Sequence, residues 1–367
     1  MILTVPLITS TQNGEIWFAI RLGLSFIYYL ITFHAAMHPL KPHLTYLDQI
    51  KKLEKRGMSF EDLPPEQAVK KIMNIGYYRL SGYWYPFRKL KLIPPAAPHE
   101  ARREEAFLAG TTFTKVYAHY LFDVKLRSSI FYGIERIETY LKAKIAYELG
   151  KVSPTAYKDK NIIQYRHRYR HDTWLEKLDY LIERNSDKDC IRWNLDKYGD
   201  IPIWAIVDIW DFGTMSRFYG MLEDKYKHQI CKSLGFLKPN SANVRDGLKT
   251  ALEHLNTVRN RCAHHARLWN TDFSDSKISI DVLDNIDLAV SCLSPQSPEL
   301  SRMAGIIFLI WSLTKRISCN STWLASVNDH LEKHQGIIPF NSMGFDNNNI
   351  SGLKNLLDKE EEQSAQS

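Results

Sequence analysis

Hydrophobic positions along most of the chain recur at the three- and four-residue spacing of amphipathic helices. The clearest stretch runs from 114 to 149, where an apolar stripe between charged residues predicts one long helix or two in succession. Shorter patterns predict a helix over 44–55, a second that ends at Gly76, and a last apolar helix over 306–317. No segment shows a convincing two-residue alternation, so we expect an all-α fold.

Two further segments have a distinctive composition. An aromatic cluster occupies 77–87 (YYRLSGYWYPF), and a proline-rich stretch of mixed charge follows at 93–105. Prolines restrict the backbone and remove hydrogen-bond donors, so we expect the second segment to be a surface loop. The polar, acidic end of the chain is expected to be a frayed tail.

The N-terminus differs in composition from the rest of the chain. Residues 16–33 form an almost unbroken apolar run whose length is marginal for a membrane span. The run is either a membrane anchor or lies upstream of an authentic start at Met37. We favour the second interpretation and expect a cytoplasmic protein with no membrane contact unless this run is translated. The predicted organisation is an apolar extension over 1–36, one helical domain over 37–346 and a polar acidic tail over 347–367.

Composition narrows the class of protein further. The chain has 367 residues and 44% hydrophobic content, enough for one large domain or roughly two. Its formal net charge of +7 fits a polyanionic partner, although many proteins of similar charge bind none. The five cysteines are widely spaced and form no C-x-x-C pair, which favours reduced thiols in a cytoplasm over a disulfide framework or a zinc site.

The segment over 255–270 (LNTVRNRCAHHARLWN) is the strongest candidate for chemistry. It places three arginines, two histidines and three amides at the end of a predicted core helix. Histidine exchanges protons near neutral pH, and the arginine fork holds a phosphate through two hydrogen bonds. These groups suit phosphodiester cleavage in which the 2'-hydroxyl of RNA attacks the neighbouring phosphorus and an arginine stabilises the developing charge.

This segment resembles a known family. Arg259-Asn260-x-x-x-His264 matches the Arg-polar-x-x-x-His signature of HEPN ribonucleases, and the extended string resembles the form characteristic of the Abi family of abortive-infection phage-resistance proteins. The short signature occurs by chance in many chains, so the extended string carries the resemblance. Other segments in the family's order extend it over 41–345; they begin at Asn74 (NIGYYRLSGYWYPF), Ile134 (IERIE), Tyr198 (YGDIPIW), Asp211 (DFGTMS) and Met343 (MGF).

The resemblance implies an HEPN-like helical bundle with additional helices, RNA cleavage without a metal or other cofactor, and a role in limiting phage growth. It would make Arg259 the phosphate-binding arginine, Asn260 the polar residue after it and His264 the general acid or base, with His265 as an alternative proton donor. RNA is the implied partner, and family analogy adds a small RNA or an antitoxin. The chain departs from the family pattern at Lys142, where an arginine is expected.

Helical geometry limits how these residues can act. Arg259 and His264 lie ~140° apart on an ideal helix, so their side chains do not converge. Either the helix ends near Cys262, or two copies of the motif face each other across a dimer, as in HEPN relatives. We therefore expect a homodimer with a composite cleft.

Other side chains are candidates for RNA contact. Bases would stack on the aromatic cluster at 77–87, although such density is more often core and rim. The basic run at 165–171 would hold an anion or form a solvated loop. Glu135 and Glu138 would orient a site arginine or form salt bridges along their helix. The candidate RNA-binding arginines are Arg79, Arg88, Arg166, Arg168, Arg170, Arg261 and Arg267.

Three other interpretations of the motif are weaker. The charged residues would form a solvated helix end that serves folding alone. Cys262 would act as a nucleophile, but it shares a helix face with Leu255 and is expected in the core. A metal is disfavoured because His264 and His265 point in different directions and no further ligand follows at the helical spacing.

Overall fold

The computed structural model describes residues 41–92, 102–273 and 301–346, with 350, 353–355 and 357–358. The chain divides into two compact units, Met1–Lys51 and Lys52–Ser367. The N-terminal extension and its apolar run lie outside the described residues, so the interpretation of this run and the expected domain boundaries stay predictions. None of the described helices combines the length and the hydrophobicity that a membrane span requires.

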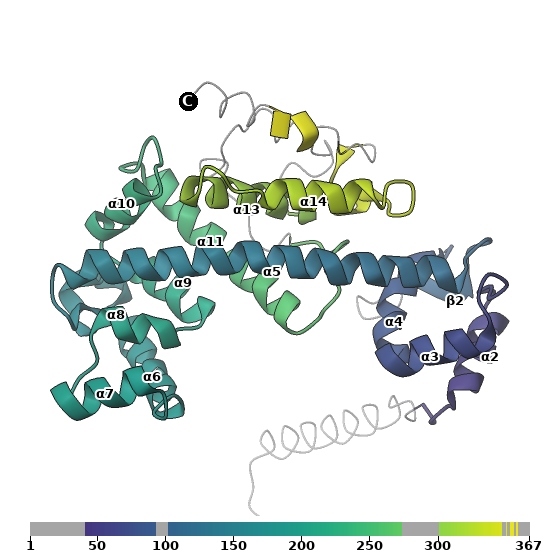
Figure 1. The fold of residues 1–367 in the computed structure, drawn as a ribbon, viewed down its shortest axis with the longest axis horizontal. Coiled ribbons are helices and arrows are strands. Elements are labelled where there is room, and N and C mark those ends of the chain that lie inside the picture. The colour runs from purple at the N-terminus through teal and green to yellow at the C-terminus, as the bar shows by residue number, and fades with distance from the viewer. Residues whose placement is uncertain are drawn as a thin grey trace, which may run out of the picture. The chain divides into compact units, whose positions relative to one another are not determined.

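One long helix, α5 (Phe113–Gly150), is the element on which the second unit is built. Thr112 caps its start by accepting a backbone N–H of the first turn. Residues on one stripe, such as Leu126, Ile130 and Ile134, are fully buried. Helices α4, α8, α10, α11, α13 and α14 all contact α5 (Figure 1). The pattern over 114–149 therefore forms one helix, one of the two outcomes that the sequence predicted.

Among the remaining helices, α2, α3 and α13 match the patterns predicted over 44–55, before Gly76 and over 306–317. The α-helices are α2 (Tyr46–Lys55), α3 (Pro65–Ile75), α4 (Tyr77–Trp84), α6 (Arg168–Arg184), α7 (Asp189–Tyr198), α8 (Ile203–Ile206), α9 (Phe212–Met221), α10 (Asp224–Ser233), α11 (Ala242–Ala263), α13 (Met303–Ile317) and α14 (Trp323–Glu332). Short 3-10 turns are η1 (Tyr85–Phe87), η2 (Ala156–Lys158), η3 (Lys160–Ile162), η4 (Tyr165–His167), η5 (Val207–Ile209) and η7 (Phe340–Met343). The all-α prediction is confirmed.

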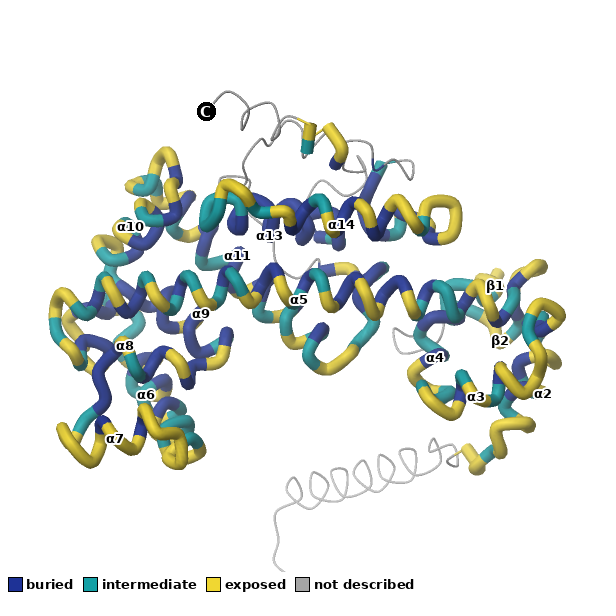
Figure 2. The backbone as a smooth tube through the Cα atoms, in the orientation of Figure 1, coloured by how far each residue is buried: buried dark blue, intermediate teal, exposed yellow. Residues whose placement is uncertain are grey.

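Helix α13 is buried along most of its length. Every residue from Met303 to Thr314 is buried, as Figure 2 shows by its dark colour. A helix that is apolar on all sides is stable only when other elements cover it. Its approach to α5 is close, since a Cβ added at Gly133 would lie 2.5 Å from the Ile310 side chain. The predicted last apolar helix is thus a core element.

A small antiparallel sheet is the exception to the helical pattern. Strand β1 (Arg88–Leu90) pairs with β2 (Arg103–Phe107). The predicted loop over 93–105 is wrong at its last three residues, which belong to β2. Pairing with β1 satisfies their backbone groups, and Phe107 is buried. The β-propensity of the residues in this segment does not predict the strand, because the strand forms by pairing with β1.

The C-terminal tail also differs from expectation where it is described. Ile350 and Leu353 are buried, although the segment was expected to be frayed. These apolar side chains remove surface from water, which favours packing over fraying. The rest of the tail lies largely outside the described residues.

Candidate functional site

Helix α11 carries the predicted motif at its C-terminal end. Leu248, Leu255 and Val258 are fully buried on one face of the helix. Cys262 continues this face, and burial raises the pKa of its thiol to about 12, so the thiol stays protonated. The prediction that Cys262 is a core residue is confirmed, and a nucleophilic role for it is disfavoured.

The end of α11 has a well-defined capping geometry. The helix ends at Ala263. This agrees with one of the two predicted outcomes, a helix end near Cys262. The His265 N–H donates to the Cys262 carbonyl at 3.0 Å, and the Ala266 N–H donates to the Arg261 carbonyl at 2.9 Å. This pair of bonds is the Schellman motif, which needs a left-handed residue between helix and loop.

His265 occupies that left-handed position with a φ of 55°. In the described part of the chain, it is the one residue other than glycine with a positive φ. Such a conformation costs an L-residue about 1–2 kcal/mol, and strain of this kind concentrates at functional sites. Both His264 and His265 are exposed, so the cap presents two imidazoles to solvent.

Arg259 lies one turn earlier and points toward α5. Its guanidinium carbon is 5.6 Å from the centre of the Phe131 ring. Its Nε is buried and, within the described ranges, has no hydrogen-bond acceptor. Asn260 is exposed and its carbonyl caps the His264 N–H at 2.9 Å. Arg259 therefore retains hydrogen-bonding capacity, although no bond in the described part joins it to His264 or His265.

A buried carboxylate anchors the chain that follows the motif. Asp123 of α5 is fully buried and accepts the N–H of Leu268 at 3.1 Å and of Trp269 at 2.7 Å. It also accepts the Tyr83 hydroxyl at 2.7 Å and forms a salt bridge with Arg127. Burial raises the pKa of the Tyr83 hydroxyl, so Tyr83 stays a donor. We call Tyr83, Asp123 and Arg127 the anchor cluster.

Three arginines bond to backbone carbonyls around the anchor cluster. Arg79 donates to the His265 carbonyl at 2.7 Å. Arg127 lies 3.4 Å from the Ala266 carbonyl, and Arg267 donates to the Gly82 carbonyl. Helix α4 is thereby bonded to the segment after the motif. Of the predicted RNA-binding arginines, Arg79 and Arg267 lie at the motif, and both donate hydrogen bonds to backbone carbonyls there.

The other predicted RNA-binding arginines are dispersed. Arg261 follows the motif arginine, and its guanidinium lies 5.9 Å from the Phe273 ring. Arg88 lies in β1, 5.9 Å from the Tyr85 ring. Arg166, Arg168 and Arg170 lie at the start of α6. Whether each contacts RNA stays a prediction.

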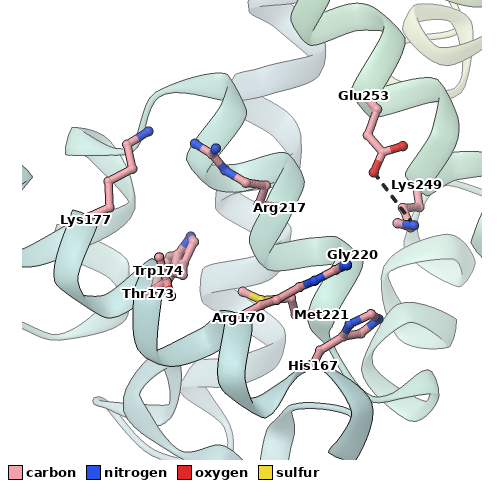
Figure 3. Close-up of a pocket in the computed structure, with 10 residues that line it drawn as sticks. All are labelled: His167, Arg170, Thr173, Trp174, Lys177, Arg217, Gly220, Met221, Lys249 and Glu253. Atoms are coloured by element: carbon pink, nitrogen blue, oxygen red, sulfur yellow. Dashed lines mark ion pairs between the residues drawn. The ribbon is translucent and has the colours of Figure 1, made fainter. Parts of the chain in front are cut away.

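The basic run does not form the solvated loop that the sequence allowed. Arg168 begins α6, and His171 is fully buried with its Nε2 2.8 Å from the Tyr157 carbonyl. Burying His171 requires helical structure through the run. Arg170 lines a pocket with Arg217 of α9 and Lys249 of α11 (Figure 3).

The other open alternatives have structural answers. In the aromatic cluster, Tyr83 and Trp84 are core residues, whereas Tyr78 is 91% exposed and free to stack. Glu138 forms a salt bridge with Lys142 at 2.8 Å, so it pairs along its own helix, as one of its two predicted roles required.

The sequence analysis missed the anchor cluster and the pocket. A signal for the cluster exists, because Asp123 and Arg127 are four residues apart and alternate with apolar positions on a buried stripe. Opposite charges placed there must pair, since an isolated buried charge is costly. No comparable signal joins Arg217 to Lys249, which lie on different helices.

Comparison with known proteins gives one family. A family model described as Abi-like protein matches residues 70–270, more than half of the 367 residues. The matched range contains the anchor cluster, the motif and the pocket. Comparisons with curated proteins and with solved structures returned no match.

Replacing Asp123 by asparagine is expected to destabilise the fold. The change keeps the shape of the side chain but leaves Arg127 as an uncompensated buried charge, which should cost about 3–5 kcal/mol. Chemical denaturation would measure the loss. The control is Asp189→Asn, which removes the partner of Arg192 at an aspartate whose side chain is 91% exposed and should change stability by less than about 1 kcal/mol. Equal stability of both variants would contradict the anchoring role.

Replacing His265 by glycine is expected to raise the free energy of unfolding. Glycine adopts the left-handed region without strain, and relief of that strain should exceed its entropic cost by about 0.5–1 kcal/mol. Urea denaturation would measure the gain. His264→Gly is the matched control, because His264 has a φ of −88° and should lose stability. A loss in both variants would contradict the strained cap.

Proposed function

This chain belongs to the Abi-like protein family, and we propose that it is an abortive-infection effector that cleaves RNA without a metal at the end of α11. The observation that carries the proposal is the rigid cap of this helix. It presents two exposed histidines, and Arg259, one turn earlier on the same helix, has unused hydrogen-bonding capacity. Proton-transfer groups and a phosphate-binding cation are the components that cyclising RNA cleavage requires.

The proposed reaction uses the RNA's own nucleophile. A histidine accepts the proton of the 2'-hydroxyl as this oxygen bonds to phosphorus. The bond from phosphorus to the 5'-oxygen breaks, and a second group donates a proton to that leaving oxygen. The products are a 2',3'-cyclic phosphate and a 5'-hydroxyl, and no oxidant or metal is consumed. His264 is the proposed base or acid, and His265 is the alternative proton donor.

Arg259 is the proposed electrostatic component. A guanidinium binds two phosphate oxygens at once and stabilises the charge that grows on them during attack. Contact with the Phe131 ring orients the guanidinium without using its donors. Asn260 contributes an exposed amide next to it.

A composite site is part of the proposal. Arg259 and His264 diverge by ~140° on the helix, and α11 ends at Ala263 with His264 as its C-cap, so one copy of the motif does not bring the two side chains together. A second copy of the motif facing the first would supply the remaining groups. We therefore propose a homodimer in which each cleavage site uses residues of both copies.

The defining prediction concerns cleavage in the presence of EDTA. His264→Ala should lower the cleavage rate of labelled RNA by about 10²–10⁴-fold, and Arg259→Ala by about 10²–10³-fold. The control Arg184→Ala removes an exposed arginine at the end of α6 and should leave the rate unchanged. RNA binding without cleavage by the wild-type protein would instead assign the motif to a non-catalytic RNA-binding module.

The dimer is tested by mixing inactive variants. If the site uses both copies, combining Arg259→Ala with His264→Ala protein should restore cleavage, because mixed dimers hold one intact arginine and one intact histidine. Analytical ultracentrifugation would establish the oligomeric state. A strictly monomeric protein that still cleaves RNA would overturn this part of the proposal.

A further inference from the structure

A pocket of about 430 Å³ lies among η4, α6, α9 and α11. Its size falls in the range typical of small-molecule sites. We propose that this pocket binds the phosphate of a nucleotide, at a site separate from the histidines at the end of α11. The inference stands on the pocket alone and holds whether or not the protein cleaves RNA.

The charge of the lining points to an anion. Arg170, Lys177, Arg217 and Lys249 line the pocket with His167, and Glu253 is the carboxylate among the lining residues (Figure 3). Such a concentration of like charge is costly unless a counter-ion is bound.

Two of these cations have no acidic partner among the described residues. Lys177 pairs with Asp211 at 3.0 Å, and Lys249 lies 3.7 Å from Glu253. In contrast, Arg170 and Arg217 form no salt bridge within the described ranges, and they project from different helices. In Figure 3, Arg217 extends toward Lys177 and Arg170 extends toward Lys249, so cations line both ends of the pocket. Each guanidinium can bind a phosphate through two hydrogen bonds.

Neighbouring buried groups indicate the same excess of positive charge. Lys227 of α10 is 1% exposed, with no salt bridge in the described part of the chain. Burial lowers its pKa, Arg166 and Lys249 lower it further, and Asp224 and Asp246 oppose them.

The pKa of His167 is lowered by burial and by the same positive charge, from the cations Arg166, Arg170, Lys227 and Lys249. Its Nδ1 is buried and, among the residues that the structure describes, has no hydrogen-bond partner. An anion in the pocket would offset the repulsion and offer this ring an acceptor.

The pocket also has an apolar part, which favours a nucleotide over a bare phosphate. Trp174 and Met221 contribute apolar surface, and the Trp174 indole N–H is already bonded to the Thr214 carbonyl at 3.0 Å. A Cβ added at Gly220 would lie 3.3 Å from Lys249 Cε, so the glycine leaves room for this side chain. A base or sugar would pack on the apolar wall while the phosphate meets the arginines.

The pocket residues of α11 and Asn260 of the motif lie on one face of the helix. Lys249, Glu253, Asn256 and Asn260 follow at spacings of four, three and four residues, which places them along one stripe. The stripe extends about 16 Å along the helix axis. The nucleotide is therefore either a free ligand or one residue of an RNA that continues toward the motif.

Binding of AMP, ATP and a 5'-phosphorylated oligoribonucleotide to the full chain, measured by calorimetry, tests the inference. Arg170→Ala and Arg217→Ala should each weaken binding at least about tenfold, as expected for loss of a charged hydrogen bond. Both side chains are exposed, so the fold should persist, which unchanged thermal unfolding would verify. Arg184→Ala, at the far end of α6, is the matched control.

The results distinguish the two sources of the nucleotide. Weaker binding of AMP or ATP in both variants supports a free nucleotide, and weaker binding of the oligoribonucleotide alone supports bound RNA. Unchanged affinity for all three ligands in both variants, or no binding by the wild-type protein, would overturn the inference. Loss of cleavage in His264→Ala with unchanged nucleotide binding would confirm that the two sites are separate.

Discussion

The placement of the motif depends on one buried carboxylate. Asp123 lies on the central helix and accepts hydrogen bonds from Tyr83, Leu268 and Trp269 while it pairs with Arg127. Burial raises the pKa of this carboxyl, and the Arg127 charge and the hydrogen bonds oppose that rise. A buried ion pair is costly to form and more costly to break. The hydrogen bonds from Leu268 and Trp269 to the Asp123 carboxylate therefore determine the path of the chain after α11.

This anchor explains how a strained cap can persist. His265 adopts a left-handed backbone conformation that glycine would adopt more easily. Its carbonyl accepts a hydrogen bond from Arg79, and the Ala266 carbonyl lies beside Arg127. The surrounding bonds hold the strained residue in place, and the two histidines stay on a rigid element instead of a free loop. Rigid support of this kind is what precise proton transfer requires.

Helix α11 joins two chemically different regions. Its C-terminal cap carries exposed histidines, whereas its middle contributes Lys249 and Glu253 to a basic pocket. Asn260 of the motif lies on the same stripe of the helix as these two pocket residues. A polyanion lying along this stripe would meet the arginines of the pocket and the proposed cleavage site together, which connects the two proposals without making either depend on the other.

Three- and four-residue periodicity in the sequence predicts α5 and α13 and places Cys262 on the core face of α11, because a helix repeats its faces along a local stretch of chain. The motif is likewise recognised from the sequence. Which polar groups meet depends on tertiary packing. Asp123 bonds to Leu268, 145 residues later, and Arg170 shares a pocket with Arg217 and Lys249. Strand β2 likewise exists because β1 pairs with it. Periodicity states which face of a helix is buried, but the partner of a polar side chain depends on how distant elements pack.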